Sequence, residues 1–363
     1  MFSERFGLVA SGVGLALLLE CAGCGQAAPN GDAHATPTAA AKANTGEPNA
    51  TPPTVAEAIA VLDLRTLPLI AGSENPGGRS VARLAYQAPG SPKTAYEFHQ
   101  KQLTDGGWEI GPHESITDES ASGSFTRDGF TVTLQASQVP GGDKPATLVM
   151  ASNLGNLTLS TLPQPPNAKV LYDMAASLAY VTPDGVEAVS AAIDKDLKAA
   201  GWEAYGTAGD TRFYRKNAIR LLATTAAAPA QEGKTVVTYF TELLSAELPA
   251  PADAKAVQYS EPPVQLYIEY PGDLAAADKW YRESLGKLGW EPTLDHPTEQ
   301  GFESFVIYRN KAGEMLEINF RPVDDFTRLT LKFTTAEEFA EMEKRWAEQK
   351  KKLEAERAAE TDK

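Results

Sequence analysis

The chain has 363 residues, more than one hydrophobic core usually holds, and this length predicts two or three domains. Its hydrophobic fraction of 42% is typical of a globular protein. A formal net charge of −15 argues against a nucleic-acid partner, because binding phosphates requires clustered Lys and Arg. The two cysteines, Cys21 and Cys24, lie near the N-terminus, so disulfides and thiolate metal sites are excluded from the rest of the chain.

The N-terminal segment is apolar from Phe6 to Leu19, which is too short for a stable membrane-spanning helix and predicts a signal peptide over residues 1–23. The sequence Ala22-Gly23-Cys24 that follows resembles the bacterial lipobox, in which small residues precede a cysteine that is diacylated and becomes the mature N-terminus. The resemblance implies that Cys24 is lipidated and anchors the protein to a membrane.

Two positions depart from the lipobox pattern, because Cys21 replaces the expected leucine and Glu4 stands beside Arg5 in the first residues. Two alternatives therefore stay open: an ordinary signal peptide cleaved near residues 26–28, or an uncleaved anchor. All three interpretations place the body of the chain outside the cytoplasm. Residues 24–54 are rich in Ala, Pro, Thr, Asn and Gly and predict a disordered tether, which as a flexible coil spans about 30 Å.

A Gly-Trp-Glu motif recurs three times, at spacings of 94 and 88 residues, and a Leu-Pro pair precedes each copy. The motifs are Gly107-Trp108-Glu109, Gly201-Trp202-Glu203 and Gly289-Trp290-Glu291. The pairs lie at residues 67–68, 162–163 and 248–249. This register predicts three copies of one unit, over residues 55–160, 161–246 and 247–335.

Each unit begins with an apolar strand, which is followed by a proline turn, a helix, a hairpin and a last strand. The expected first strands cover residues 81–88, 176–181 and 264–270, and the expected last strands cover 146–151, 235–241 and 328–333. The order β-α-β-β-β predicts the α+β class, as three tandem two-layer domains in which a helix packs on an antiparallel sheet.

The helix of each unit carries an apolar stripe thirteen, nine and five residues before its tryptophan, and the second residue before the tryptophan is expected to continue it. The stripe positions are Ala95, His99 and Leu103; Val189, Ile193 and Leu197; and Ala277, Tyr281 and Leu285, continued by Gly106, Ala200 and Leu288. Glycine before each tryptophan suits a left-handed helix end. Trp108, Trp202 and Trp290 are expected to fill the seam between helix and sheet.

Residues 336–363 are rich in Glu, Lys, Arg and Ala and predict a charged amphipathic helix. Its apolar residues recur at heptad-like intervals as Phe339, Met342, Trp346 and Leu353. Two interpretations stay open: the stripe packs on the third unit, or the helix binds a partner or a second copy.

The chain shows no recognisable catalytic, phosphate-binding or metal-binding motif, so we expect neither enzymatic activity nor a cofactor. The histidines are His34, His99, His113 and His296, and none has metal-ligand spacing. His99 falls on the helix stripe and is expected to be a buried structural residue. Glu109, Glu203 and Glu291 recur in all three units and are expected on the solvent face of a strand.

Aromatic and basic residues recur together after each tryptophan, as Phe125 with Arg127, Tyr214 with Arg215, and Tyr308 with Arg309. Stacked with the tryptophans, they are candidates for a groove that binds a glycan or peptide. Ordinary alternation on a half-exposed strand produces the same pattern, and this alternative stays open.

The pattern of strand, proline turn, helix ending in Gly-Trp-Glu and further strands, behind a lipobox, resembles uncharacterised bacterial lipoproteins built from tandem βαβββ modules. It also distantly resembles helix-grip modules in lipoproteins of the outer-membrane assembly machinery. These resemblances imply a non-enzymatic scaffold or interaction protein of the cell envelope whose partners are envelope proteins or the cell wall. Gly25 in place of an aspartate after the lipidated cysteine favours the outer membrane. The alternative function is a binding module for a small apolar or glycan ligand.

Overall fold

The computed structural model of the protein describes residues 51–361 apart from 75–77, 113 and 142–145, without the side chains of 353 and 355–361. The predicted signal peptide, Cys24 and most of the predicted tether lie outside the described residues. The prediction of a disordered tether is wrong for its last residues, because Pro52 and Pro53 are buried and their carbonyls accept from Asn217 Nδ2 and the Ala218 amide, at 2.7 and 2.9 Å. The described residues all belong to one structural unit. Among them, no helix is both long enough and apolar enough to cross a membrane.

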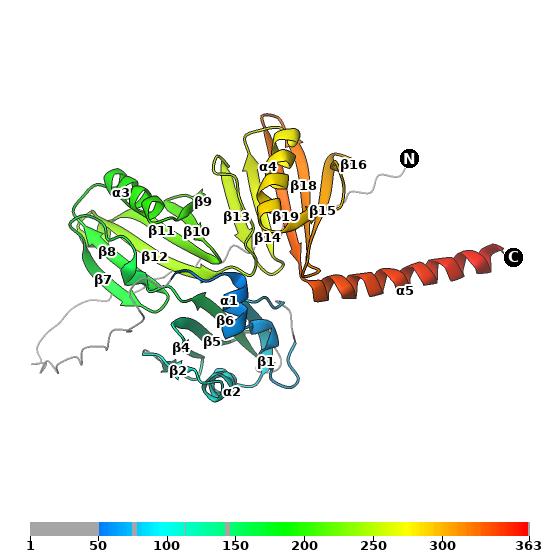
Figure 1. Ribbon diagram of the computed structural model, residues 1–363. Helices are drawn as coiled ribbons and strands as arrows, with labels where there is room; N and C mark the ends of the chain where they lie inside the picture. Colours follow the sequence, from blue (N-terminus) through cyan, green and yellow to red (C-terminus); the bar gives the residue numbers. More distant parts are fainter. Residues whose placement is uncertain (1–50, 75–77, 113, 142–145, 362–363) are drawn as a thin grey trace, which may run out of the picture. The chain divides into compact units, whose positions relative to one another are not determined.

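In the described part of the chain, five α-helices and 19 strands, which form three antiparallel sheets, confirm the predicted α+β class (Figure 1). The first sheet contains β1 (Arg83–Pro89), β2 (Glu109–Ile110), β3 (Ser115–Ile116), β4 (Ser120–Arg127), β5 (Phe130–Gln138) and β6 (Ala146–Gly155). The second contains β7 (Lys169–Met174), β8 (Ser177–Thr182), β9 (Glu203–Ala208), β10 (Thr211–Lys216), β11 (Ile219–Ala228) and β12 (Lys234–Leu243). The third contains β13 (Ala256–Ser260), β14 (Gln265–Tyr270), β15 (Trp290–Pro292), β16 (Thr298–Gln300), β17 (Glu303–Asn310), β18 (Met315–Val323) and β19 (Phe326–Thr334).

The three sheets share one strand order: β1-β6-β5-β4-β2, β8-β12-β11-β10-β9 and β14-β19-β18-β17-β15. In each, the first strand pairs with the last, and the strand that follows the helix lies on the far side of the sheet. The connecting helices are α2 (Pro92–Asp105), α3 (Val186–Ala199) and α4 (Leu274–Lys287). Each helix therefore carries the chain across one face of its sheet (Figure 1).

The predicted order β-α-β-β-β omits strands at the edges of the sheets. β2, β9 and β15 begin at or just after the three tryptophans, where a strand that carries Glu109, Glu203 and Glu291 is expected although the order does not count it. β7 and β13, which precede the first strand of their units, are not predicted. The strands of two or three residues are too short to show alternation. In β7, a bulge between Val170 and Tyr172 interrupts the alternation.

The predicted helix stripe is buried in all three units. Helix α2 contacts β4, β5 and β6, α3 contacts β11, and α4 contacts β15 and β18. The nine stripe residues are buried, namely Ala95, His99, Leu103, Val189, Ile193, Leu197, Ala277, Tyr281 and Leu285. The expected continuation of the stripe is wrong: Leu288 is 49% exposed, and Gly106 and Ala200 are exposed as well. These residues are C-caps, where the helix and its buried face end.

Glycine ends each of these helices in the left-handed region. Gly107, Gly201 and Gly289 have φ of +81°, +82° and +82°. In the first two units the following tryptophan amide donates back to the last helical turn, from Trp108 to the Leu103 carbonyl and from Trp202 to the Leu197 carbonyl, both at 3.0 Å. The turn directs Trp108 and Trp202 into the core, whereas Trp290 is half-buried.

The Leu-Pro pairs also have a structural role, because each proline carbonyl accepts a side-chain hydrogen bond. Tyr239 Oη donates to Pro163 at 2.7 Å, and Tyr281 Oη donates to Pro249 at 3.1 Å. In the first unit, Gln102 Nε2 donates to the carbonyl of Pro68 at 3.4 Å. These bonds attach the entry segment of each unit to its helix or sheet.

The C-terminal helix α5 (Ala336–Thr361) begins with a capping box in which the Thr335 amide donates to Glu338 and the Glu338 amide donates back. Its first turns contact the third sheet, with the Arg309 guanidinium 3.4 Å from the centroid of the Phe339 ring. From residue 343 to residue 352 every side chain is exposed. Packing on the third unit therefore ends near Met342, and Leu353 lies outside the described side chains.

We expect Gly289→Ala to lower the free energy of unfolding by about 1–2 kcal/mol, because a left-handed φ forces Cβ against the backbone. Gly286→Ala is the matched control: it lies within α4, and neither glycine has any atom within 4 Å of a built Cβ. This control is expected to raise the free energy of unfolding by about 0.5–1 kcal/mol. Urea unfolding followed by circular dichroism measures both, and shifts of the same sign would contradict the assigned role of Gly289.

Candidate functional site

The aromatic residues of the predicted groove lie in the hydrophobic cores. Phe125, Tyr214 and Tyr308 are at most 1% exposed. They sit on β4, β10 and β17 with their rings toward the helix side of each core, as the contact of Tyr96 on α2 with Phe125 illustrates. Fully buried rings have no face left for stacking on a glycan or peptide. The groove hypothesis therefore fails for the aromatic residues, and strand alternation explains their pattern.

The basic residues of the predicted groove make contacts within the protein. Arg127 lies 5.0 Å from the centroid of the Trp108 ring and donates to the carbonyl of Gly106, the C-cap of α2, at 2.8 Å. Arg215 pairs with Glu203 at 2.8 Å, and Arg309 stacks on Phe339. A cation at a helix C-terminus is favourable because unpaired carbonyls carry partial negative charge there. These arginines stabilise helix ends and strand edges.

His99 is fully buried, as expected for a structural histidine. Its Nε2 lies 2.5 Å from Tyr86 Oη, and its Nδ1 lies 3.1 Å from Gln102 Oε1. Burial lowers the pKa of His99 to about 4, although the bond to Gln102 opposes this shift. His296 is exposed, while His34 and His113 lie outside the described residues. Glu109, Glu203 and Glu291 are exposed on their strands, as expected.

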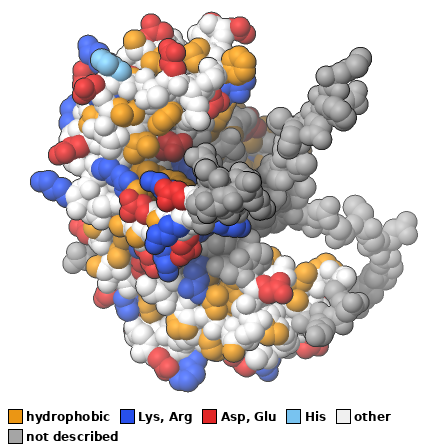
Figure 2. All heavy atoms as spheres, turned by 90° about the vertical axis from the view of Figure 1, so that its right-hand side faces the viewer, with side chains coloured by type: hydrophobic (Ala, Val, Ile, Leu, Met, Phe, Trp, Pro, Cys, Tyr) orange, Lys and Arg blue, Asp and Glu red, His pale blue; other side chains and the backbone are white. Residues whose placement is uncertain are grey.

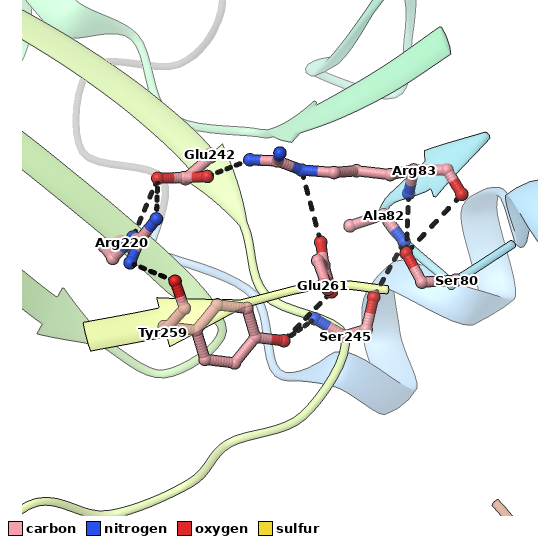
Figure 3. Close-up of polar contacts among 8 residues, drawn as sticks. All are labelled: Ser80, Ala82, Arg83, Arg220, Glu242, Ser245, Tyr259 and Glu261. Atoms are coloured by element: carbon pink, nitrogen blue, oxygen red, sulfur yellow. Dashed lines mark hydrogen bonds and ion pairs between the residues drawn. The ribbon is translucent and has the colours of Figure 1, made fainter. Parts of the chain in front are cut away.

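A cluster of charged and polar side chains joins the three sheets, and sequence analysis did not predict it (Figure 3). At its centre, the Glu242 carboxylate on β12 accepts from Arg220 Nε on β11 at 2.7 Å. The same carboxylate forms an ion pair with Arg83 on β1 of the first sheet. The Glu242 side chain is only 8% exposed, so these two arginines supply the positive charge that its burial requires.

The cluster continues into the third sheet through Tyr259 on β13. Tyr259 Oη donates to Glu261 Oε2 at 2.9 Å and accepts from the Ser245 amide at 3.1 Å. Ser245 Oγ in turn accepts from the Ala82 amide at 3.0 Å. Glu261 Oε1 lies 3.4 Å from Arg83 Nε. Arg83 of the first sheet therefore forms an ion pair with a carboxylate that directly follows β13 of the third sheet. We call these residues the junction cluster: Arg83, Arg220, Glu242, Ser245, Tyr259 and Glu261.

The charges of the junction cluster balance, with two guanidinium groups and two carboxylates. Burial raises the pKa of the Glu261 carboxyl, and hydrogen bonds from Ser245 and Tyr259 together with the charge of Arg83 oppose the rise. Burial and the neighbouring Glu261 raise the pKa of Tyr259 well above its ordinary value. Each ionisable group of the cluster is therefore held by another member, which is the arrangement of a structural contact.

The sequence offered one weak signal for this cluster. Arg83 and Glu242 are 159 positions apart, so no local spacing connects them. Glu242, however, lies in a strand whose neighbours Thr241 and Leu243 are both buried, and a carboxylate in a fully buried stretch requires a partner. This argument predicts that some cation is present without indicating which one.

A pocket of about 240 Å³ lies next to the cluster, and Ser80, Val81 and Ser245 form part of its wall. Charges of both signs line it, including Arg65, Arg79, Lys332, Glu338, Glu341 and Arg345. Arg79 donates to the carbonyls of Arg65 and Leu67, at 2.6 and 3.0 Å, and Glu338 belongs to the capping box of α5. Figure 2 shows acidic and basic side chains intermixed on one face of the molecule.

Comparison with known proteins identifies no relative: no family model, curated protein or solved structure matches the chain. Within the part of the chain that the structure describes, no three His, Cys, Asp or Glu side chains are grouped so that they could hold a metal ion.

We expect Glu242→Ala to lower the free energy of unfolding by about 2–4 kcal/mol, because it leaves Arg83 and Arg220 without their shared carboxylate. The cost lies below that of a fully buried pair, since the Arg83 side chain is 39% exposed. Lys101→Ala is the control, because it removes an exposed pair with Asp105 and is expected to cost under about 0.5 kcal/mol. If urea unfolding shows that Glu242→Ala and Lys101→Ala lower the free energy of unfolding equally, the junction cluster stabilises the protein no more than an exposed ion pair does.

His99 predicts a pH dependence of stability. Its pKa is about 4 in the folded protein and about 6.5 when unfolded, so the unfolded state binds more protons between these values. The free energy of unfolding should fall as pH decreases from about 6.5 to about 4, by roughly 3 kcal/mol from this residue. His99→Gln, which cannot titrate, should remove this component. Parallel stability curves for wild type and variant over this range would contradict the prediction.

Proposed function

We propose that the protein is a non-enzymatic, membrane-tethered lipoprotein of the cell envelope that acts as a scaffold or interaction protein. The observation that carries the proposal is the junction cluster. Its ionisable groups, which are the best-placed candidates for chemistry in the described residues, pair with one another across three sheets. Groups arranged in this way stabilise a rigid multi-sheet body and leave little reactivity for a substrate.

The three sheets with their helices are, in this proposal, three tandem two-layer βαβββ modules with added edge strands. Three features support a common origin: the identical strand order, the left-handed glycine before each tryptophan and the bonded proline carbonyl. Repeated modules present similar surfaces side by side, which suits contacts with other proteins or with the cell wall.

The alternative function is a binding module for a small apolar or glycan ligand. An apolar ligand would need an open cavity beneath a helix, but the stripes of α2, α3 and α4 are fully buried against their sheets. The pocket beside the junction cluster, at about 240 Å³, is smaller than the roughly 300–1,000 Å³ of most ligand pockets. Charges of both signs line the pocket, and several of them are already hydrogen-bonded within the protein. The pocket therefore supports ligand binding less well than the junction cluster supports a scaffold function.

The membrane anchor in this proposal is Cys24, and the residues between it and Thr51 act as the tether. Two or three acyl chains hold a protein stably, since each buried methylene contributes about 0.8 kcal/mol. The acidic net charge makes a lipid more effective than electrostatic attraction to an anionic membrane surface. Localisation outside the cytoplasm, with the outer membrane favoured, follows from the lipobox interpretation.

The proposal is tested by in-cell crosslinking, purification of the tagged protein from envelope fractions and mass spectrometry of the co-purifying proteins. Wild type is expected in the membrane fraction together with a stoichiometric envelope partner. Cys24→Ser is expected to move the protein to the soluble fraction and to lose that partner. If the wild type is soluble and no protein co-purifies with it, both the anchor and the scaffold function are wrong.

A further inference from the structure

Phe302 lies at the tip of the hairpin that joins β16 to β17. It is 93% exposed, the largest exposed fraction of any large apolar residue in the described part of the chain. The two-residue turn requires a positive φ at its first position, which Gly301 supplies with a φ of +66°. The turn does not require an aromatic ring at its second position, so folding does not explain the phenylalanine.

A single exposed apolar residue is common, but Phe302 belongs to a shallow hollow of about 480 Å³ on the third sheet. This volume lies within the roughly 300–1,000 Å³ of most ligand pockets. The other side chains that line the hollow are Gln300, Glu303, Phe305, Asn319 and Arg321. Phe305 lies opposite Asn319 and Gln300 lies opposite Glu303, so they share one face of the sheet. The other face carries Val306 and Tyr308, which are buried in one core with the stripe of α4.

The polar side chains around the two rings provide both donors and acceptors. Gln300 and Asn319 carry amides, and the charged groups of Glu303 and Arg321 lie 3.9 Å apart. The side chains of this ion pair are 46% and 53% exposed, so the pair is weak and its groups are accessible to a ligand. A charged ligand would meet one group of like charge. A neutral ligand whose groups both donate and accept matches the hollow better.

The hollow does not suit two common ways of binding a peptide. An added strand requires a free sheet edge, but the hollow lies on a sheet face, and both β16 and β18 pair with β17 there. A bound amphipathic helix requires a long apolar groove, but the two rings of this hollow are bordered by polar side chains. A ligand with an apolar ring face and a rim of hydroxyl groups fits both properties of the hollow.

We propose that this hollow binds a neutral β-linked glycan, with the Phe302 ring stacked on the C–H groups of a sugar ring. The sugar hydroxyls, which both donate and accept, lie within reach of the amide, carboxylate and guanidinium groups at the rim. Glu303 and Arg321 each offer two adjacent polar atoms and suit neighbouring hydroxyls. The proposal goes beyond the scaffold function, because the hollow shares no residue with the junction cluster and binding requires no lipid anchor.

Isothermal titration calorimetry of the full chain, in a detergent without sugar groups, tests the proposal with chitohexaose and cellohexaose as probes. We expect at least one of them to bind. Phe302→Ala removes the stacked ring and is expected to weaken binding at least about tenfold, whereas Phe302→Tyr keeps a ring and is expected to bind like wild type. Ile116→Ala is the matched control, because it removes an exposed apolar side chain from β3, which pairs with β4 as β16 pairs with β17. This control is expected to leave the affinity unchanged.

The substituted side chains are exposed, and circular dichroism with urea unfolding confirms that the variants fold. If neither hexasaccharide binds, the proposal is wrong. Binding that Phe302→Ala leaves unchanged, or that Ile116→Ala weakens equally, would place the site elsewhere and also overturn it. Binding of decaproline in place of both hexasaccharides would assign the hollow to a proline-rich peptide and overturn the glycan assignment. These results are independent of the envelope-partner test, since they require no cellular partner.

Discussion

The buried Glu242 carboxylate is the constraint on which the contact between the three sheets depends. It is paired with Arg220 of its own sheet and Arg83 of the first, and Arg83 in turn reaches Glu261 beside the third. Removing a carboxylate from water is costly unless cations accompany it. The strands that carry Glu242, Arg220 and Arg83 must therefore stay in contact. The pairing of these charges in this way fixes how the sheets are placed relative to one another. The surrounding aliphatic core supplies most of the stability but does not specify which strands meet.

Much of each sheet could be predicted because its determinants are local. A helix stripe at spacings of four residues, followed by glycine and tryptophan, predicts a buried face, a helix end and a change of direction within about twenty residues. The structure shows this device three times, with Leu103, Leu197 and Leu285 as its buried leucines. The recurrence of the motif strengthened the prediction, because a pattern that is ambiguous once is more reliable when it appears three times in the same register.

The features that the sequence did not predict have a common cause: each depends on residues that are far away in the sequence. The alternating Phe125 and Arg127 were compatible with a groove because the sequence does not say what covers each strand face. The structure directs the ring into the core and the guanidinium onto Trp108. The partners of Glu242 were likewise hidden, since Arg83 lies in another unit. Strands of two or three residues, such as β2 and β15, exist only because a longer neighbour pairs with them.

The two edge strands β7 and β13 show that sheets with one strand order can have unequal surfaces. Three such sheets joined in one chain bury some of their edges against each other, as β13 does against β9, but the chain does not provide every sheet with the same neighbour. The second unit contacts the first through β6 and β12, which leaves β7 exposed. A strand of this kind keeps the apolar residues that its position favours, and in β7 the side chains of Val170, Leu171, Tyr172 and Met174 stay exposed.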